Sequence, residues 1–206
     1  MARRRSGLGI VYARVDVKIW VTDFPSVGAV RPTHCSRCGA ASCPHGQPIV
    51  LRGHGVRERQ GRGPLEANGE PKLVVITVRR YRCVRCGGIT TVFPRGLARR
   101  QYYSASAIGL ALLLFGHRQQ PVRQIRQRVS PWQLSFESQD RWTTLSRWLG
   151  AIEVGQLFEE VRPAAPDCPA RLRAQRAAST LLSFAPSTLA HASLDEQVFA
   201  GAALAA

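Results

Sequence analysis

The chain has 206 residues, of which 45% are apolar, and it carries a formal net charge of +16. This length and apolar content exclude global disorder, and the longest apolar run, residues 107–115, is too short to span a membrane. The charge predicts a polyanionic partner and is uneven, because residues 1–130 carry 23 basic and 5 acidic side chains whereas residues 131–206 carry 6 and 8.

The N-terminal part is expected to be β-structure arranged around two cysteine pairs. After a basic arm at residues 3–5, the alternation of Val15, Val17, Ile19 and Val21 predicts a strand over residues 14–21. Further strands are expected at residues 48–57, 72–82 and 89–93, with a hairpin loop at residues 61–71. The pairs, each written Cys-x-x-Cys-Gly, stand before the second strand and between the last two.

The two pairs supply four thiolates, Cys35, Cys38, Cys83 and Cys86, which is the ligand set of a closed structural zinc site. We call the two Cys-x-x-Cys-Gly segments, residues 35–39 and 83–87, the first and second knuckle. A knuckle, a β-hairpin and a second knuckle form the layout of a zinc ribbon. Two alternatives for the ligand set stay open: Cys43 or His45 replaces one of the four, or these residues and His34 build a second site. A redox pair would need a βαβ pattern, and a catalytic zinc would need a nearby acidic base, and neither pattern accompanies the cysteines.

The pattern changes to helical spacing after Pro94. Helices are expected at residues 104–116, capped by Ser104, at residues 121–129, and at residues 138–152, where Trp142, Leu145, Trp148 and Leu149 form an apolar stripe. Three short helices in this order predict a helix-turn-helix region. After a linker at residues 163–166, two alanine-rich helices at residues 171–184 and 187–204 are expected to pack onto the others or to mediate oligomerisation.

The predicted fold class is therefore α+β, with a zinc ribbon of antiparallel β-structure at residues 1–96, a helix-turn-helix-like region at 97–161 and a helical tail at 162–206. Eleven polar side chains are candidates for contacts with nucleic acid, as phosphate ligands or, on the third helix, as readers of bases. They are Arg79, Arg80, Arg82, Arg85, Arg99, Arg100, Arg123, Arg126, Arg141, Thr144 and Arg147.

Aromatic residues lie among these arginines, and their role stays open. Tyr81 alternates with arginines on the strand at residues 72–82, so it either stacks on bases or faces the ribbon core. Tyr102 and Tyr103 precede the first helix. The polar face of the third helix is either a reading surface or an ordinary solvated face.

The second knuckle with its arginine strand, residues 79–87, and the stretch Thr143-Thr144-Leu145-Ser146-Arg147-Trp148-Leu149 are similar to the N-terminal zinc ribbon and helix-turn-helix of bacterial insertion-sequence transposases. They more closely resemble the short stand-alone zinc-ribbon proteins that accompany such elements. The resemblance covers roughly residues 30–150 and implies DNA binding, structural zinc and a transposase or integrase encoded nearby as partner. The ribonuclease-H-like catalytic domain of transposases has no counterpart in residues 151–206, so strand-transfer activity is not expected.

These observations predict a non-enzymatic, zinc-stabilised protein that binds duplex DNA, associated with the nucleoid in the cytoplasm, since no secretory signal is visible at Met1–Arg5. An RNA-binding or ribosome-associated zinc ribbon is the alternative, because basic ribbons with aromatic side chains suit RNA as well. A nuclease or deaminase is the least supported reading, because the sequence shows no constellation of carboxylates or histidines.

Overall fold

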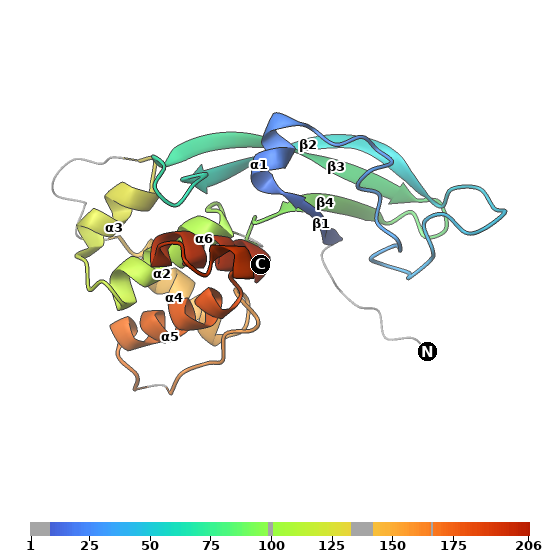
Figure 1. The fold of residues 1–206 in the computed structure, drawn as a ribbon. Coiled ribbons are helices and arrows are strands. Elements are labelled where there is room, and N and C mark those ends of the chain that lie inside the picture. The colour runs from blue at the N-terminus through green and yellow to red at the C-terminus, as the bar shows by residue number, and fades with distance from the viewer. Residues whose placement is uncertain (1–8, 99–100, 133–141, 166) are drawn as a thin grey trace. The chain divides into compact units, whose positions relative to one another are not determined.

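A computed structural model describes residues 9–98, 101–132, 142–165 and 167–206 (Figure 1). It is an α+β protein that divides into two compact units. Residues 1–59 and 75–95 form the strand unit, and residues 60–74 and 96–206 form the helical unit. Residues 60–74, at the tip of the predicted hairpin, group with the helices, and residues 97–161 and 162–206 lie in the same unit.

The strand unit contains a four-stranded sheet with the order β1-β4-β3-β2. Its strands are β1 (Ile10–Asp16), β2 (Leu51–Gly63), β3 (Lys72–Cys83) and β4 (Ile89–Arg95), of which β2 and β3 extend into the helical unit. β3 and β4 pair antiparallel, as expected, whereas β1 pairs parallel to β4. The purely antiparallel sheet predicted for this region is therefore wrong, because a long connection allows β1 to join β4 in parallel.

The strand predicted over residues 14–21 ends at Asp16, where helix α1 (Val17–Thr22) begins. The Asp16 carboxylate accepts a hydrogen bond of 2.9 Å from the backbone N–H of Lys18 and so caps the helix. The helix buries Trp20 and leaves Ile19 57% exposed, the reverse of what the alternation predicted. The indole N–H of Trp20 donates to the Thr77 carbonyl on β3 at 2.7 Å. The burial of this large ring against β3 therefore favours a helix over a strand at residues 17–22.

The loop of the β2–β3 hairpin is shorter than predicted. β2 continues to Gly63, so the loop between the two strands comprises residues 64–71 rather than 61–71. The strand at 72–82 and the return strand at 89–93 are confirmed as β3 and β4.

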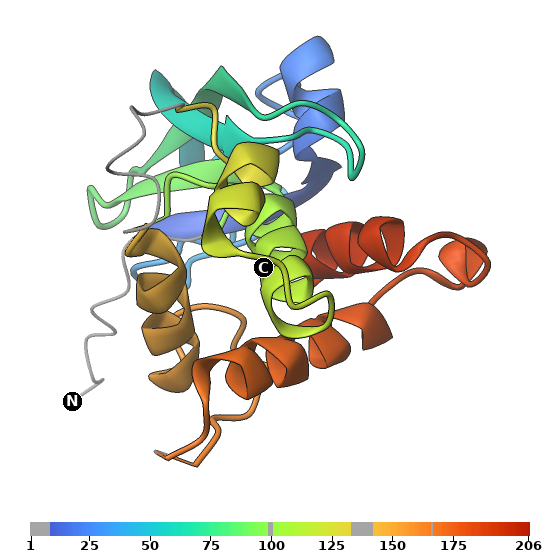
Figure 2. The ribbon, with the colours of Figure 1, turned by 90° about the vertical axis from the view of Figure 1, so that its left-hand side faces the viewer.

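The helical unit is built around α2 (Ala105–Gly116), which packs against α3 (Val122–Val129), α5 (Ala170–Ser183) and α6 (Leu194–Leu204) (Figure 2). Ser104 caps α2 as predicted, its hydroxyl accepting the Ala107 N–H at 3.1 Å. Every residue of α2 except Phe115 is buried, so this helix is apolar on all sides rather than on one face. The tail helices α5 and α6 therefore belong to the same core as α2.

α4 (Thr144–Glu153) buries Leu145, Trp148 and Leu149 of the predicted stripe, and Trp142 is buried just before the helix. The predicted helix over residues 138–152 therefore starts later than expected, since residues 142 and 143 are not helical, and residues 138–141 lie outside the described residues. In the tail, the second predicted helix is divided into a 3-10 turn at residues 187–189 and α6, which Ser193 and Glu196 cap reciprocally.

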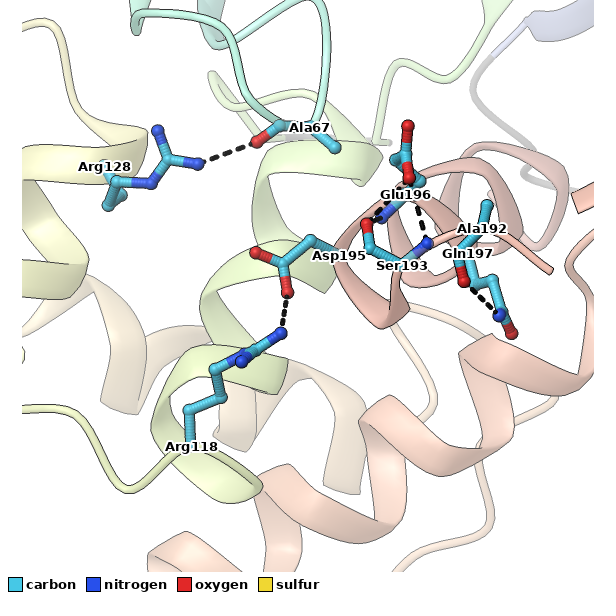
Figure 3. A network of polar contacts seen from close by, with 8 residues as sticks. All are labelled: Ala67, Arg118, Arg128, Ala192, Ser193, Asp195, Glu196 and Gln197. Carbon is cyan, nitrogen blue, oxygen red and sulfur yellow. Dashed lines mark hydrogen bonds and ion pairs between the residues drawn. The ribbon is translucent and has the colours of Figure 1, made fainter.

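Polar contacts on the surface of the helical unit connect its helices and loops to one another (Figure 3). The Arg118 guanidinium forms an ion pair of 2.7 Å with Asp195 on α6, and Arg128 on α3 donates to the Ala67 carbonyl at 2.9 Å. Arg173 on α5 forms an ion pair with Glu153 on α4. Among the described residues, no helix combines the length and apolarity needed to cross a membrane.

Two glycines in this unit offer a matched test of its packing. A Cβ on Gly201 of α6 would collide with the Leu181 carbonyl oxygen of α5, whereas a Cβ on Gly150 of α4 would meet nothing within 4 Å. We expect Gly201→Ala to destabilise the helical unit by about 1–3 kcal/mol through overpacking. Gly150→Ala should stabilise it by about 0.5–1 kcal/mol through helix propensity. Denaturation followed by circular dichroism at 222 nm measures both, and equal effects of the two changes would contradict this packing.

Candidate metal centre and arginine surface

The two cysteine pairs form matching turns in the strand unit. In the first, the Gly39 N–H donates to the Cys35 carbonyl at 2.9 Å, and in the second the Gly87 N–H donates to the Cys83 carbonyl at 2.9 Å. Gly39 and Gly87 have φ values of 70° and 68°, a left-handed conformation that glycine adopts without steric cost. The repeated Cys-x-x-Cys-Gly sequence thus folds twice into the same local structure.

The turns bring four sulfur atoms together. Cys35 Sγ lies 3.8 Å from Cys86 Sγ, Cys38 Sγ lies 3.8 Å from Cys83 Sγ, and all four sulfur atoms lie within 4.8 Å of one another. A tetrahedral ion with metal–sulfur bonds of about 2.3 Å separates its ligands by about 3.8 Å. The donor set and its spacing therefore fit a metal ion. The separations are too long for a disulfide, whose S–S bond is about 2.05 Å.

Backbone and side-chain contacts orient the sulfur atoms. The Arg37 N–H points at Cys35 Sγ and the Gly88 N–H at Cys86 Sγ, both at 3.4 Å. Such amide contacts stabilise thiolate charge and hold each ligand in place. Cys35 and Cys83 are buried, whereas Cys38 is exposed, so the cluster lies at the edge of the unit.

The surroundings shift the pKa values of Cys35 and Cys38 in opposite directions. Burial acts to raise the pKa of Cys35, but hydrogen bonds from Cys38, Arg37 and Cys86 outweigh burial and lower the pKa to about 7. The backbone of Ala40 acts to lower the pKa of Cys38, but burial and the three neighbouring thiols raise it to about 12. A cation among the sulfur atoms favours the thiolate form of each ligand.

The other candidate ligands lie apart from this cluster. Cys43 is exposed and accepts a hydrogen bond of 3.4 Å from the Arg31 guanidinium, and His34 Nδ1 lies 3.1 Å from the Thr33 hydroxyl. Among the described residues, the group of metal-competent side chains comprises the four predicted cysteines and includes neither Cys43, His34 nor His45.

The predicted arginines of β3 and the second knuckle differ in their surroundings. Arg79 is half-buried, donates from Nε to the Pro25 carbonyl at 2.6 Å and has its guanidinium carbon 4.2 Å from the Phe24 ring centroid, so these contacts fix the direction of its guanidinium. Arg80 is half-buried, whereas Arg82 and Arg85 are exposed. The last two are therefore the members of this set that present charge to solvent.

Tyr81 faces the core of the strand unit. It is fully buried, and its hydroxyl donates to the Val27 carbonyl at 2.8 Å. Burial raises the pKa of this phenol, which therefore stays protonated. The stacking role considered for Tyr81 is wrong, because the ring has no exposed face.

The residues of the helical unit that were predicted to contact nucleic acid also differ in their exposure to solvent. Arg123 and Arg147 are exposed and Thr144 is half-buried, but Arg126 is only 8% exposed and packs within the unit. The amphipathic α3 turns Arg126 inward, so this residue presents little surface for the phosphate contact expected from it. Arg99, Arg100 and Arg141 lie outside the described residues.

Arg37 was not predicted, yet it is exposed in the first knuckle. It holds the same place in Cys-Ser-Arg-Cys that Arg85 holds in Cys-Val-Arg-Cys, so the repeat itself was the signal that could have identified it. The strand unit as a whole carries 15 basic and 3 acidic side chains, whereas the helical unit carries 14 and 10. The positive charge is thus concentrated in the unit that holds the four cysteines.

Comparison of the chain with protein-family models, with curated proteins and with solved structures found no match.

Proposed function

We propose that this protein is a zinc-stabilised DNA-binding protein, a transposase-related accessory or regulatory protein of a mobile element. The observation that carries the proposal is the position of the four-thiol cluster in a unit with a net charge of +12, where Arg37, Arg82 and Arg85 are exposed on the cluster's own turns and strand. Exposed arginines on a rigid scaffold are suited to bidentate contacts with phosphates.

Zinc has a structural role in this proposal. Four thiolates complete a tetrahedral shell, whereas a catalytic zinc keeps one position for water or substrate. The ion joins residues 35–38 to residues 83–86 and thereby holds the exposed arginines of both knuckles on one scaffold. The protein is proposed to act by binding, with no reaction assigned to the metal.

The helical unit supplies the second part of the proposed DNA interface. α2, α3 and α4 are taken as a helix-turn-helix region in which α4 enters the major groove. Its N-terminal turn carries Thr144, and Arg147 is exposed one turn later, opposite the buried Leu145 and Trp148. Arg123 on α3 is the candidate for a neighbouring phosphate. The mobile-element context and a transposase or integrase partner rest on the resemblance of residues 79–87 and 143–149.

Selection of random duplex DNA against the zinc-loaded full chain tests this function. We expect retained sequences to share a motif bound roughly 10³-fold more tightly than random DNA. A steep salt dependence without a motif would reduce the function to phosphate-driven binding. Tighter binding of RNA than of duplex DNA at the same salt concentration would replace it with the RNA-binding alternative.

The exposed arginines of the strand unit should determine the salt dependence. We expect Arg82→Ala and Arg85→Ala each to reduce the slope of log affinity against log salt by about 1, because each removes one phosphate contact. Arg176→Ala, which removes an equally exposed charge from α5, should leave the slope unchanged. Fluorescence anisotropy with labelled duplex DNA at several salt concentrations measures the slopes. If neither Arg82→Ala nor Arg85→Ala changed the salt slope, the exposed arginines of the strand unit would not belong to the DNA interface.

A further inference from the structure

Two exposed aromatic rings flank one arginine in the helical unit. The guanidinium carbon of Arg62 lies 4.6 Å from the ring centroid of Tyr102 and 5.8 Å from that of Trp132. Tyr102 is 62% exposed and Trp132 is 49% exposed. We call these three residues the stacking platform.

The backbone fixes the first side of the platform. The Arg62 N–H donates to the Tyr102 carbonyl at 2.8 Å, and the Ser104 N–H donates to the Arg62 carbonyl at 3.0 Å. These paired bonds tie the end of β2 to the segment that enters α2. Arg62 and Tyr102 are therefore held side by side by the main chain, and their ring-to-cation contact needs little ordering of either side chain.

The core fixes the second side. Tyr103, next to Tyr102, is buried, and its hydroxyl donates to Ser130 Oγ at 2.9 Å. The backbone N–H of Trp132 in turn donates to the same Ser130 Oγ at 3.4 Å. One buried serine thus connects the segments that carry the two exposed rings, so that Tyr102 and Trp132 project from a common support.

The exposure of these rings is not explained by the fold. Tyr103, Trp142 and Trp148 next to them are buried and pack edge to face, so this core accommodates aromatic side chains. Tyr102 and Trp132 instead remain outside, each with substantial ring area accessible to solvent. Among the described residues, Arg62 Nε has no hydrogen-bond partner although it is shielded from solvent.

We propose that the stacking platform binds an unpaired nucleotide of DNA. The base stacks on the exposed face of Tyr102 or Trp132, and Arg62 supplies positive charge for the adjoining phosphate. Stacking needs only a π-face, so the platform accepts any base. This inference rests on the proposed function and deepens it, because it adds single-stranded DNA beside a duplex to the substrates of the protein.

Anisotropy titrations with three matched DNA molecules test the platform. The first is a blunt duplex, the second is the same duplex with a single-stranded thymidine overhang, and the third carries an abasic overhang with the same number of phosphates. We expect the zinc-loaded full chain to bind the thymidine overhang about tenfold more tightly than the abasic one, within the range reported for base–aromatic stacking. Replacing both Tyr102 and Trp132 by alanine should remove this difference, whereas replacing both by phenylalanine, which keeps an aromatic ring at each position, should retain it.

Tryptophan fluorescence gives an independent measurement. Of the four tryptophans, Trp20, Trp142 and Trp148 are buried, so Trp132 is the one whose ring a base can approach. Added thymidine oligonucleotide should quench the emission of the wild-type chain, and Trp132→Phe should abolish this quenching. The Arg176→Ala variant, altered on the exposed side of α5, should be quenched as strongly as the wild type.

The outcomes separate this inference from the proposed function. Equal binding of the thymidine and abasic overhangs, with intact duplex binding, overturns the platform and leaves the DNA-binding proposal standing. Failure to bind all three molecules overturns the proposed function. Stronger quenching and tighter binding by a uridine oligoribonucleotide than by its deoxy counterpart overturns DNA as the ligand and assigns the platform to unpaired RNA.

Discussion

Replacing Cys83 and Cys86 by serine is expected to unfold the strand unit while the helical unit stays folded. Cys83 ends β3 and Cys86 follows it in the second turn, and without their thiolates the cluster loses half of its candidate ligands. Structural zinc contributes about 10–16 kcal/mol in zinc-finger peptides, so the loss exceeds the whole stability of a small domain. Limited proteolysis with mass spectrometry should show cleavage within residues 9–59 and 75–95, with protection of α2–α6.

The matched control is Cys43→Ser, which changes an exposed thiol outside the cluster. This variant should keep one metal ion per chain and the protection of the wild type. Elemental analysis of the purified chain identifies the ion, and we expect zinc, although a four-thiolate site also accepts iron. A folded double variant without metal would show that the cluster is dispensable, and loss of metal in Cys43→Ser would assign that thiol to the site.

Trp148→Ala is expected to destabilise the helical unit by about 3–5 kcal/mol. Trp148 is 1% exposed and contacts Tyr103 and Trp142 edge to face, with ring centroids 5.0 and 5.3 Å away. Its removal leaves a large cavity beneath α4 and takes a partner from both other rings. Urea denaturation followed by near-ultraviolet circular dichroism measures the change in the helical unit.

Val154→Ala provides the control for this change. Val154 lies at the end of α4 and is 66% exposed, so its truncation should alter stability by no more than about 0.5 kcal/mol. A loss below about 1 kcal/mol in Trp148→Ala would mean that the aromatic cluster does not hold α4. The proposed presentation of Arg147 by a rigid helix would then lack its support.

Local signals in the sequence predicted much of the candidate metal centre. Each Cys-x-x-Cys-Gly repeat sets its own turn, because glycine permits the positive φ that the backbone hydrogen bond requires. Strands β3 and β4 adjoin the second knuckle and pair across it, so their register follows from neighbours in sequence. The two knuckles are separated by 44 residues and meet only through tertiary folding. We expected them to meet because four thiolates complete one zinc site, but no interaction between neighbouring residues requires it.

Other predictions failed where packing outweighed the local pattern. The alternation around residues 14–21 was a sound strand signal, yet the burial of Trp20 against β3 and the cap from Asp16 produced a helix. Arg126 is charged, as surface residues usually are, but α3 turns it inward beside Ile125 and Val129. Tyr102 and Tyr103 are adjacent and chemically identical, and only the core decided which of them is buried.

The sequence by itself determined the group of four cysteines, the turns that carry it, the strands on either side of the second knuckle, the N-cap of α2 and the apolar positions of α4. All of these depend on interactions between residues a few positions apart, whose spacing is visible in the chain. The tertiary structure alone decided the parallel pairing of β1, the complete burial of α2, the loss of Arg126 from the surface and the meeting of Arg62 with Tyr102 and Trp132. These depend on contacts between distant segments, where burial of large side chains outweighs local preference.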